Sequence, residues 1–247
     1  MKVINLVALI LLILGVVAIN AQTHKIFSNV LQKYVKNGLV NYKELKKDQD
    51  FEKYLNQLSN TDPSKFSEKK ELAFWINTYN AFTIKAILDN YPVKSINDIK
   101  FGEKSVWDEN FISINKKKYS LNEIEHKILR VKFNEPRIHF AIVCASISCP
   151  ELRNEAYEAD KLDKQLQEQT VKFLRDKKKN SLDLKNKKAE ISRIFEWFGE
   201  DFGKSDKDIL MYISNFLPDD VRKDIKQNIN EWTISYKKYD WNLNEIK

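Results

Sequence analysis

The strongest helical pattern in the chain lies between residues 68 and 91. Apolar side chains recur there about every 3.6 residues, the period of an amphipathic helix. They are Leu72, Trp75, Ile76, Tyr79, Phe82, Ala86 and Ile87. Ser67 is a candidate N-cap, and Tyr91-Pro92 marks the end because a residue before proline avoids helical angles. We therefore predict one long helix over 68–91.

The rest of the chain alternates short helical and extended patterns. Ser120 and Glu123 form a capping box that opens a helix. Several short helices around an extended turn are predicted within 24–58. Single helices are predicted over 120–130, 158–175, 209–216 and 221–229. Hairpins are predicted over 111–119 and 181–192, and a buried strand over 137–144. Because the strands are few and not in βαβ alternation, the pattern predicts an α+β fold, mostly helical, with a small antiparallel sheet.

The N-terminal segment has the pattern of a targeting signal. Lys2 precedes an unbroken apolar run over 6–19, and the small residue Ala21 follows. This pattern is typical of a secretory signal peptide, whereas a membrane-spanning helix needs about 20 apolar residues. We expect residues 1–21 to be a signal peptide, residues 22–247 to form one domain, and the protein to be periplasmic or secreted. Only an uncleaved leader would anchor it in a membrane.

The composition excludes several classes of function. The 42 basic residues against 35 acidic ones give a net charge of +7, but the lysines are interleaved with acids, which indicates a solvated surface. Nucleic-acid readers favour Arg and concentrate their charge on one face, so no nucleic-acid partner is expected. The 5 glycines are too scattered for a phosphate-binding loop, and no cofactor is expected.

The residues with the most chemical potential lie between 126 and 149. Cys149 precedes Pro150 and Glu151, which are typical of a helix N-terminus, where the helix dipole lowers a thiol pKa. Cys149 is therefore the candidate nucleophile. On the predicted strand, Cys144 shares a face with apolar neighbours and resembles a small core residue.

Two histidines precede these thiols in the sequence. His126 shares a predicted helix face with Glu123 and Arg130, and a carboxylate there could orient the imidazole as a base. His139 lies on the predicted strand. A dyad of Cys149 with His126 or His139 would suit a thiol hydrolase or acyl transferase.

Other interpretations of the two cysteines remain open. An exported protein meets an oxidising compartment, so Cys144 and Cys149 could form a disulfide. A zinc site with the histidines is a further alternative, although the spacing is loose and no metal is expected. The last alternative is that both thiols are buried and chemically inert.

Asn77 and Asn80 lie three residues apart in the aromatic-rich part of the predicted long helix. Buried amides need hydrogen-bond partners. Their partners are either the backbone of neighbouring loops or, alternatively, a histidine or a substrate carbonyl that the amides would orient or polarise.

Several segments resemble one known family. They read F-W-I-N-T-Y-N-A at 74–81, Y-P-V-K-S-I at 91–96, I-E-H-K-I-L-R at 124–130, R-I-H-F-A-I-V-C-A-S-I-S-C-P at 137–150 and Y-D-W-N-L-N at 239–244. In this order they resemble the domain of unknown function 547, whose members include bacterial exported or envelope proteins and plant proteins. The resemblance runs from about residue 24 to the end and implies a single domain without an established activity.

The resemblance also implies which positions are the family's signature. They are Asn77, Asn80, His126, Arg130, His139, Cys144, Ser146 and, in the bacterial form, Cys149. Plant-type members do not all keep a cysteine matching Cys149, which shifts weight towards Cys144. The helix followed by an H-F-A-I-V segment is loosely similar to papain-like and transglutaminase-like thiol enzymes, a likeness of fold only.

The sequence thus yields two hypotheses of function. One is an exported thiol hydrolase or acyl transferase with Cys149, Cys144, His126 and His139 as catalytic candidates. Its substrate-binding candidates are Asn77, Asn80, Arg130 and Ser146. The other is a non-catalytic cell-envelope binding module with a polar pocket. In both, the ligand is an unknown small molecule or peptide-like group.

Overall fold

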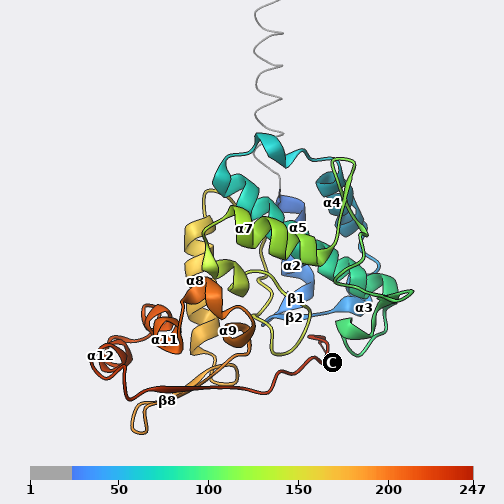
Figure 1. Cartoon of the computed structure of the whole chain (residues 1–247). Coiled ribbons are helices and arrows are strands. Elements are labelled where there is room, and N and C mark those ends of the chain that lie inside the picture. The colour runs from blue at the N-terminus through green and yellow to red at the C-terminus, as the bar shows by residue number, and fades with distance from the viewer. Residues whose placement is uncertain (1–23, 247) are drawn as a thin grey trace, which may run out of the picture.

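The predicted long helix is α5, Glu68–Asn90, which runs through the middle of the molecule (Figure 1). A computed structural model describes residues 24–246, so the predicted signal peptide lies outside the described residues. From Leu72 to Leu88 every side chain of α5 except Lys85 is buried. Ser67 is the N-cap, but its side chain makes no capping hydrogen bond; its carbonyl accepts from the Glu71 N–H instead.

The N-terminal segment packs short elements against α5. Its elements are α2 (Lys25–Tyr34), β1 (Val35–Lys36), β2 (Leu39–Val40), α3 (Tyr42–Leu45) and α4 (Gln49–Ser59). The rings of Phe27 in α2 and Tyr54 in α4 stack 4.6 Å apart, which joins the two helices. These are the short helices around an extended turn that the sequence predicts.

The middle of the chain contains small hairpins and a distorted helix. The elements are η1 (Pro63–Lys65), η2 (Ile96–Asp98), β3 (Lys100–Phe101), β4 (Lys104–Ser105), β5 (Ile112–Ile114), β6 (Lys117–Tyr119), α6 (Leu121–Glu123), η3 (Ile124–Leu129) and α7 (Arg130–Lys132). The capping box of Ser120 and Glu123 is present, and η3 is a π-helix. The hairpin and helix predictions are confirmed here.

The prediction of a buried strand over 137–144 is wrong. The segment forms a 3-10 helix, η4 (Pro136–Phe140), followed by irregular backbone. Pro136 starts the helical turn and the Glu135 carboxylate accepts from the Arg137 N–H. The apolar density reports burial and not backbone conformation, because a short buried run has no diagnostic period.

The predicted helix start at Cys149-Pro150 is also absent. Irregular backbone follows Pro150, and the next long helix, α8, spans Leu162–Arg175 instead of 158–175. Side-chain amides satisfy the backbone of this irregular stretch. Gln165 donates to the Ala156 carbonyl and accepts from the Glu158 N–H.

The last third of the chain forms a second apolar cluster. Its elements are β7 (Ser181–Asp183), β8 (Lys188–Ile191), α9 (Ile194–Trp197), α10 (Gly199–Phe202), α11 (Asp206–Ser214), α12 (Asp219–Gln227) and β9 (Thr233–Tyr236). β7 pairs antiparallel with β8, as predicted, but β9 pairs with β8 in parallel. Phe140 of η4 packs on Phe173, Phe195 and Phe202 and so links η4 to this cluster.

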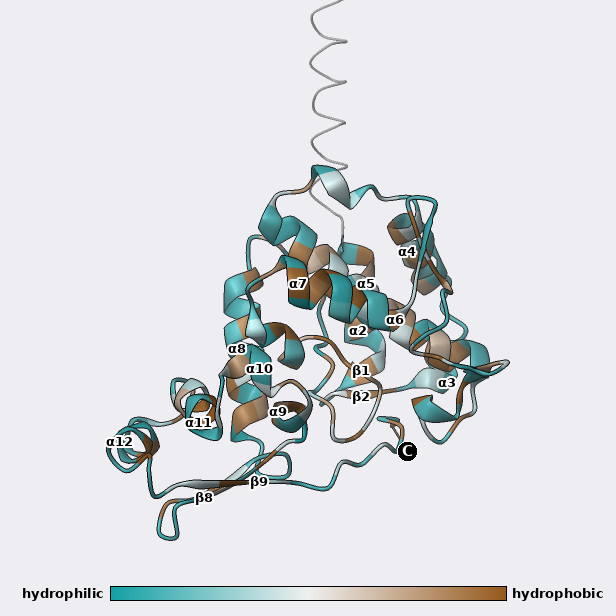
Figure 2. Ribbon diagram, viewed as in Figure 1, coloured by the Kyte–Doolittle hydropathy of each residue, from teal (hydrophilic) through white to brown (hydrophobic). Residues whose placement is uncertain are grey.

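The whole is the predicted α+β architecture, in which helices of mixed hydropathy surround α5 (Figure 2). A likeness to papain or transglutaminase is not confirmed. No helix within residues 24–246 has the length and apolar character needed to cross a bilayer.

The C-terminal tail returns across the molecule and ends near β1, β2 and α3 (Figure 1). Val40 donates its N–H to the Asn244 carbonyl and accepts from the Ile246 N–H. The Tyr42 hydroxyl donates to Asn244 Oδ1 at 2.7 Å. The tail is therefore held at its far end, and its middle crosses the segment that carries both cysteines.

Candidate functional site

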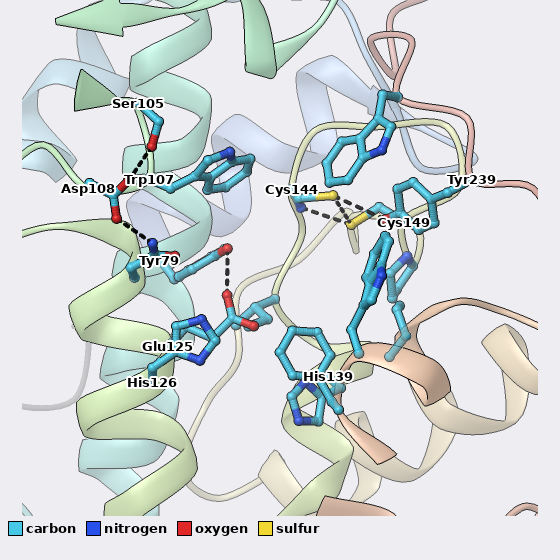
Figure 3. Close-up of a pocket in the computed structure, with 17 residues that line it drawn as sticks. Tyr79, Ser105, Trp107, Asp108, Glu125, His126, His139, Cys144, Cys149 and Tyr239 are labelled. Carbon is cyan, nitrogen blue, oxygen red and sulfur yellow. Dashed lines mark hydrogen bonds between the residues drawn. The ribbon is translucent and has the colours of Figure 1, made fainter. Parts of the chain in front are cut away.

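One pocket of about 270 Å³ gathers most of the chemically reactive side chains of the described chain (Figure 3). Cys144, Cys149, His126 and His139, all nominated from the sequence, line it. Its other lining side chains include Tyr79, Trp107, Asp108, Glu125, Trp197, Phe198, Tyr239 and Trp241. Six of the seventeen lining residues are Tyr, Trp or Phe.

The two thiols lie against each other at one end of the pocket. Their Sγ atoms are 2.8 Å apart, and both cysteines are free. The Cys144 N–H donates to Cys149 Sγ at 2.9 Å. Cys144 is half-buried, whereas Cys149 is only 4% exposed. Both cysteines line the pocket, and Cys144 is the more accessible of the two.

The backbone beside Cys144 is strained. Ala145 is buried and adopts a φ of 57°, in the left-handed region that residues with a Cβ rarely enter. Such strain persists only where surrounding contacts enforce it, and it concentrates at functional sites. The Ala145 carbonyl accepts from the Asn244 N–H at 3.0 Å, so the C-terminal tail holds this turn.

The surroundings of Cys144 favour a thiolate. Burial by itself would raise its pKa, but hydrogen bonds from neighbouring groups outweigh burial and lower the pKa of Cys144 to about 7. These groups are the Cys149 thiol, the Ser146 hydroxyl and N–H, and the Tyr239 hydroxyl. Burial, with the hydrogen bond and charge of Cys144, raises the pKa of Cys149 well above its usual value. Of the two thiols, Cys144 is therefore the one that ionises first as pH rises.

The tail delivers Tyr239 to the thiols by pairing with the 145–148 loop. Ile147 donates its N–H to the Asn242 carbonyl at 2.9 Å, and Ser148 Oγ accepts from the Asp240 N–H at 2.8 Å. The Tyr239 hydroxyl then lies 3.3 Å from Cys144 Sγ and 3.3 Å from Ser146 Oγ. Ser146 itself lies 3.2 Å from Cys144 Sγ, so the site brings this nominated residue to the thiol.

The two imidazoles belong to a separate polar cluster. His139 Nε2 lies 2.6 Å from Asp201 Oδ2, and Arg130 forms two hydrogen bonds with the same carboxylate. His126 Nδ1 lies 3.1 Å from the Arg130 guanidinium. The Phe198 ring stacks on His139 at 4.4 Å. Arg130 is thus engaged with protein groups and does not line the pocket that holds the thiols.

Burial dominates the titration of these histidines. It lowers the pKa of His139 despite the Asp201 carboxylate, and burial together with the charge of Arg130 lowers the pKa of His126. Although burial opposes it, the hydrogen bonds from His139 and Arg130 hold the pKa of Asp201 well below its usual range. Both imidazoles are therefore neutral at neutral pH, while Asp201 is charged.

The thiol–imidazole dyad expected from the sequence is not formed. Figure 3 shows the thiols at one end of the pocket and His126 and His139 at the other. Glu123, expected to orient His126, instead accepts from the Ser120 N–H and from Lys127. Cys149 does not lie at a helix N-terminus, so the reason given for its reactivity is wrong.

Glu125 is a titratable group that the sequence reasoning missed. It is 8% exposed, lines the pocket, and accepts a hydrogen bond from the Tyr79 hydroxyl at 3.0 Å. Burial raises the pKa of Glu125 to about 7, and the negative charge of Cys144 contributes in the same direction. The π-helix η3, a geometry frequent at functional sites, contains both Glu125 and His126.

Three rings form an aromatic wall beside the thiols. The centroid of Tyr239 lies 4.8 Å from that of Trp197 and 4.7 Å from that of Trp241. Trp197 is 42% exposed, so the wall continues to the surface. Both aromatic residues of the 239–244 motif, Tyr239 and Trp241, thus line the pocket.

Asn77 and Asn80 line no part of this pocket. Asn80 donates to the Ala141 carbonyl at 2.9 Å and accepts from the Val143 N–H at 2.8 Å. Asn77 makes the same pair of bonds with the backbone of Tyr157, at 2.8 and 2.9 Å. Both amides are buried and fully engaged. Both amides therefore bond to backbone groups and not to a histidine or a substrate. Asn80 in this way fixes the segment that leads into Cys144.

Asp201, Glu125, Tyr239 and Trp241 are site residues absent from the sequence-based set. No local sequence pattern could have nominated Asp201, because it lies 62 residues from its partner His139. Glu125 adjoins His126 within a recognised motif, and this adjacency could have nominated it. Within residues 24–246, no group of three or more His, Cys, Asp or Glu side chains could hold a metal ion, which leaves the zinc alternative without a ligand set.

Among known proteins, the chain is similar to one family model. No curated protein and no solved structure matches the chain. The family model described as "Protein of unknown function, DUF547" matches residues 63–174, a range that contains every site residue nominated from the sequence. This part of the chain, from η1 to α8, is therefore similar to the DUF547 family.

Proposed function

We propose that this protein is a thiol-dependent hydrolase or acyl transferase in which Cys144 is the nucleophile. The observation that carries the proposal is the half-buried Cys144, which lines the pocket and whose sulfur lies within hydrogen-bond distance of Cys149, Ser146 and Tyr239. A thiolate and not a thiol is the attacking species, and donors around the sulfur increase its population. Export to the periplasm or the medium, suggested by residues 1–21, completes the proposal.

The proposed reaction begins with attack of the Cys144 electron pair on a substrate carbonyl carbon. The carbonyl π electrons move to oxygen, then return as the bond to the leaving group breaks, which leaves a thioester on Cys144. The leaving group takes a proton from Glu125, whose raised pKa keeps part of the population protonated at neutral pH. Water or a second nucleophile then attacks the thioester, returns a proton to Glu125, and releases Cys144.

This assignment changes the roles expected from the sequence. Once Cys144 is ionised, the Cys149 thiol donates to its sulfur, together with the hydroxyls of Ser146 and Tyr239. His126 and His139 hold the far end of the pocket through Arg130 and Asp201 and do not activate the thiol. The catalytic proton carrier moves from imidazole to Glu125.

A synthetic acyl donor tests the proposal directly. With p-nitrophenyl acetate, wild-type protein should release one burst of nitrophenolate per site and carry an acetyl group on Cys144, located by peptide mapping. Cys144→Ala should lose the burst, and the matched variant Cys149→Ala should keep an acetylated Cys144. An equal burst in Cys144→Ala, or acetyl groups on lysines only, would overturn the proposal.

The second candidate is a non-catalytic envelope binding module. The aromatic wall of Trp197, Tyr239 and Trp241 favours it, since stacked rings bind the apolar face of a ligand with little loss of side-chain entropy. It predicts no acyl-enzyme with p-nitrophenyl acetate. It also predicts saturable quenching of tryptophan fluorescence by peptides or glycan fragments, retained in Cys144→Ala and lost in Trp197→Ala.

A further inference from the structure

The two cysteines differ in accessibility although their sulfurs are in contact. Both line the pocket, with their Sγ atoms 2.8 Å apart, but Cys144 is half-buried, whereas Cys149 is only 4% exposed. An incoming group in the pocket therefore meets Cys144 first. Cys149 is then positioned to attack whatever becomes bonded to the Cys144 sulfur.

We propose that Cys144 and Cys149 form a thiol–disulfide exchange couple that reduces a disulfide presented in the aromatic pocket. The Cys144 thiolate attacks one sulfur of the substrate disulfide, the substrate S–S bond breaks, and the first substrate thiolate leaves. The mixed disulfide on Cys144 is then attacked by Cys149, which releases the second substrate thiolate and its own proton. The substrate gains two electrons, and the couple loses them as it forms the Cys144–Cys149 disulfide.

The first step depends on the groups that hold the Cys144 sulfur. The hydroxyls of Ser146 and Tyr239 lie 3.2 and 3.3 Å from it. Ser146 belongs to the loop between the cysteines and Tyr239 to the C-terminal tail, and a bridge between Ser146 and Leu243 pairs these two segments. These donors favour a thiolate, and the rate of exchange rises with thiolate population. The Tyr239, Trp197 and Trp241 rings provide an apolar surface beside the sulfur that suits a peptide-like disulfide.

The second step depends on the loop between the cysteines. Residues 145–148 are held by the tail through the carbonyl of Ala145, the N–H of Ile147 and the hydroxyl of Ser148. Lys179 donates to the Cys149 carbonyl at 2.5 Å from the other side. Cys149 therefore stays beside Cys144 while a substrate is attached, which favours the intramolecular attack.

The exchange proposal shares the Cys144 thiolate with the proposed function but needs no acyl substrate. If both hold, oxidation to the disulfide consumes the nucleophile and stops acyl transfer, and reduction restores it. Cys149 then has two roles, as hydrogen-bond donor to the thiolate and as the resolving thiol of the couple.

Oxidised glutathione is a suitable probe because mass spectrometry detects the glutathione added to the protein. In wild-type protein with residues 1–21 removed, we expect no lasting adduct but a Cys144–Cys149 disulfide and two released glutathiones. Cys149→Ser should trap one glutathione on Cys144, and Cys144→Ser should give neither adduct nor disulfide. Cys144→Ser should also react with Ellman's disulfide at least about tenfold more slowly than Cys149→Ser, because its remaining thiol is buried and largely protonated.

A stable glutathione adduct on wild-type Cys144, or primary attack by Cys149, would overturn the exchange couple. The p-nitrophenyl acetate burst is measured in parallel on reduced wild type and on Cys149→Ser. A normal burst without exchange contradicts this inference alone. Exchange without a burst contradicts the acyl-transfer proposal alone, so the two failures are distinguishable.

Discussion

The Tyr239 hydroxyl lies 3.3 Å from Cys144 Sγ although the two residues are 95 positions apart in the chain. The C-terminal tail makes this contact possible by pairing with the 145–148 loop and anchoring on Val40. A tyrosine in a terminal segment thus influences the reactivity of a thiol in the matched family region.

Tyr239→Phe should raise the pKa of Cys144. Loss of one hydrogen bond costs about 1 kcal/mol, which corresponds to a rise of somewhat less than about one pKa unit. The pH dependence of iodoacetamide alkylation of Cys144 measures it. Tyr236→Phe, in β9 and not lining the pocket, is the matched control and should leave the profile unchanged. Equal profiles for wild type and Tyr239→Phe would show that Tyr239 does not stabilise the thiolate.

Acylation of Cys144 should follow a bell-shaped pH profile centred near neutrality. The Cys144 thiolate increases as pH rises through about 7, while protonated Glu125 decreases over the same range. Glu125→Gln should lower the rate with an amide substrate by about 10²–10⁴ and remove the falling limb. Alkylation by iodoacetamide, which needs no proton donor, should persist in this variant. A falling limb that survives in Glu125→Gln contradicts the assigned role.

Asn80→Ala should destabilise the fold strongly. It leaves the buried Ala141 carbonyl and Val143 N–H without partners, at about 1–3 kcal/mol for each group. Urea denaturation measures the loss. Asn90→Ala, at the exposed end of the same helix, removes only a bond to the Ala86 carbonyl and should cost less than about 1 kcal/mol. Similar losses of stability in the two variants would refute the role of Asn80 in holding the backbone of Ala141 and Val143.

Gly38→Ala should destabilise the protein more than Gly102→Ala. Both glycines have positive φ, 77° and 63°, so both variants carry the backbone cost of about 1 kcal/mol. A Cβ on Gly38 would also lie 2.6 Å from Glu151 Cβ, whereas a Cβ on Gly102 meets nothing within 4 Å. The difference in melting temperature between the two variants measures the cost of the steric clash with Glu151. Because Glu151 follows Cys149-Pro150, Gly38→Ala should also alter thiol reactivity.

The sequence by itself determined the elements whose signals are local. The periodicity and the proline predicted α5 to within a residue, and Ser120 with Glu123 predicted the start of α6, because periodicity and caps depend on neighbours a few residues apart. Turn residues similarly predicted the two hairpins. The scarcity of strands then sufficed for the α+β class.

Tertiary structure decided the conformation of 137–144 and the partners of each reactive group. Asn80 supplies the hydrogen bonds that a neighbouring strand would have supplied, so the segment is buried without being a strand. Asp201 engages His139, and Tyr239 reaches Cys144, from segments that no local pattern connects to them. The sequence therefore nominated the cysteines and histidines but paired them wrongly, because hydrogen-bond partners are chosen across the fold and not along the chain.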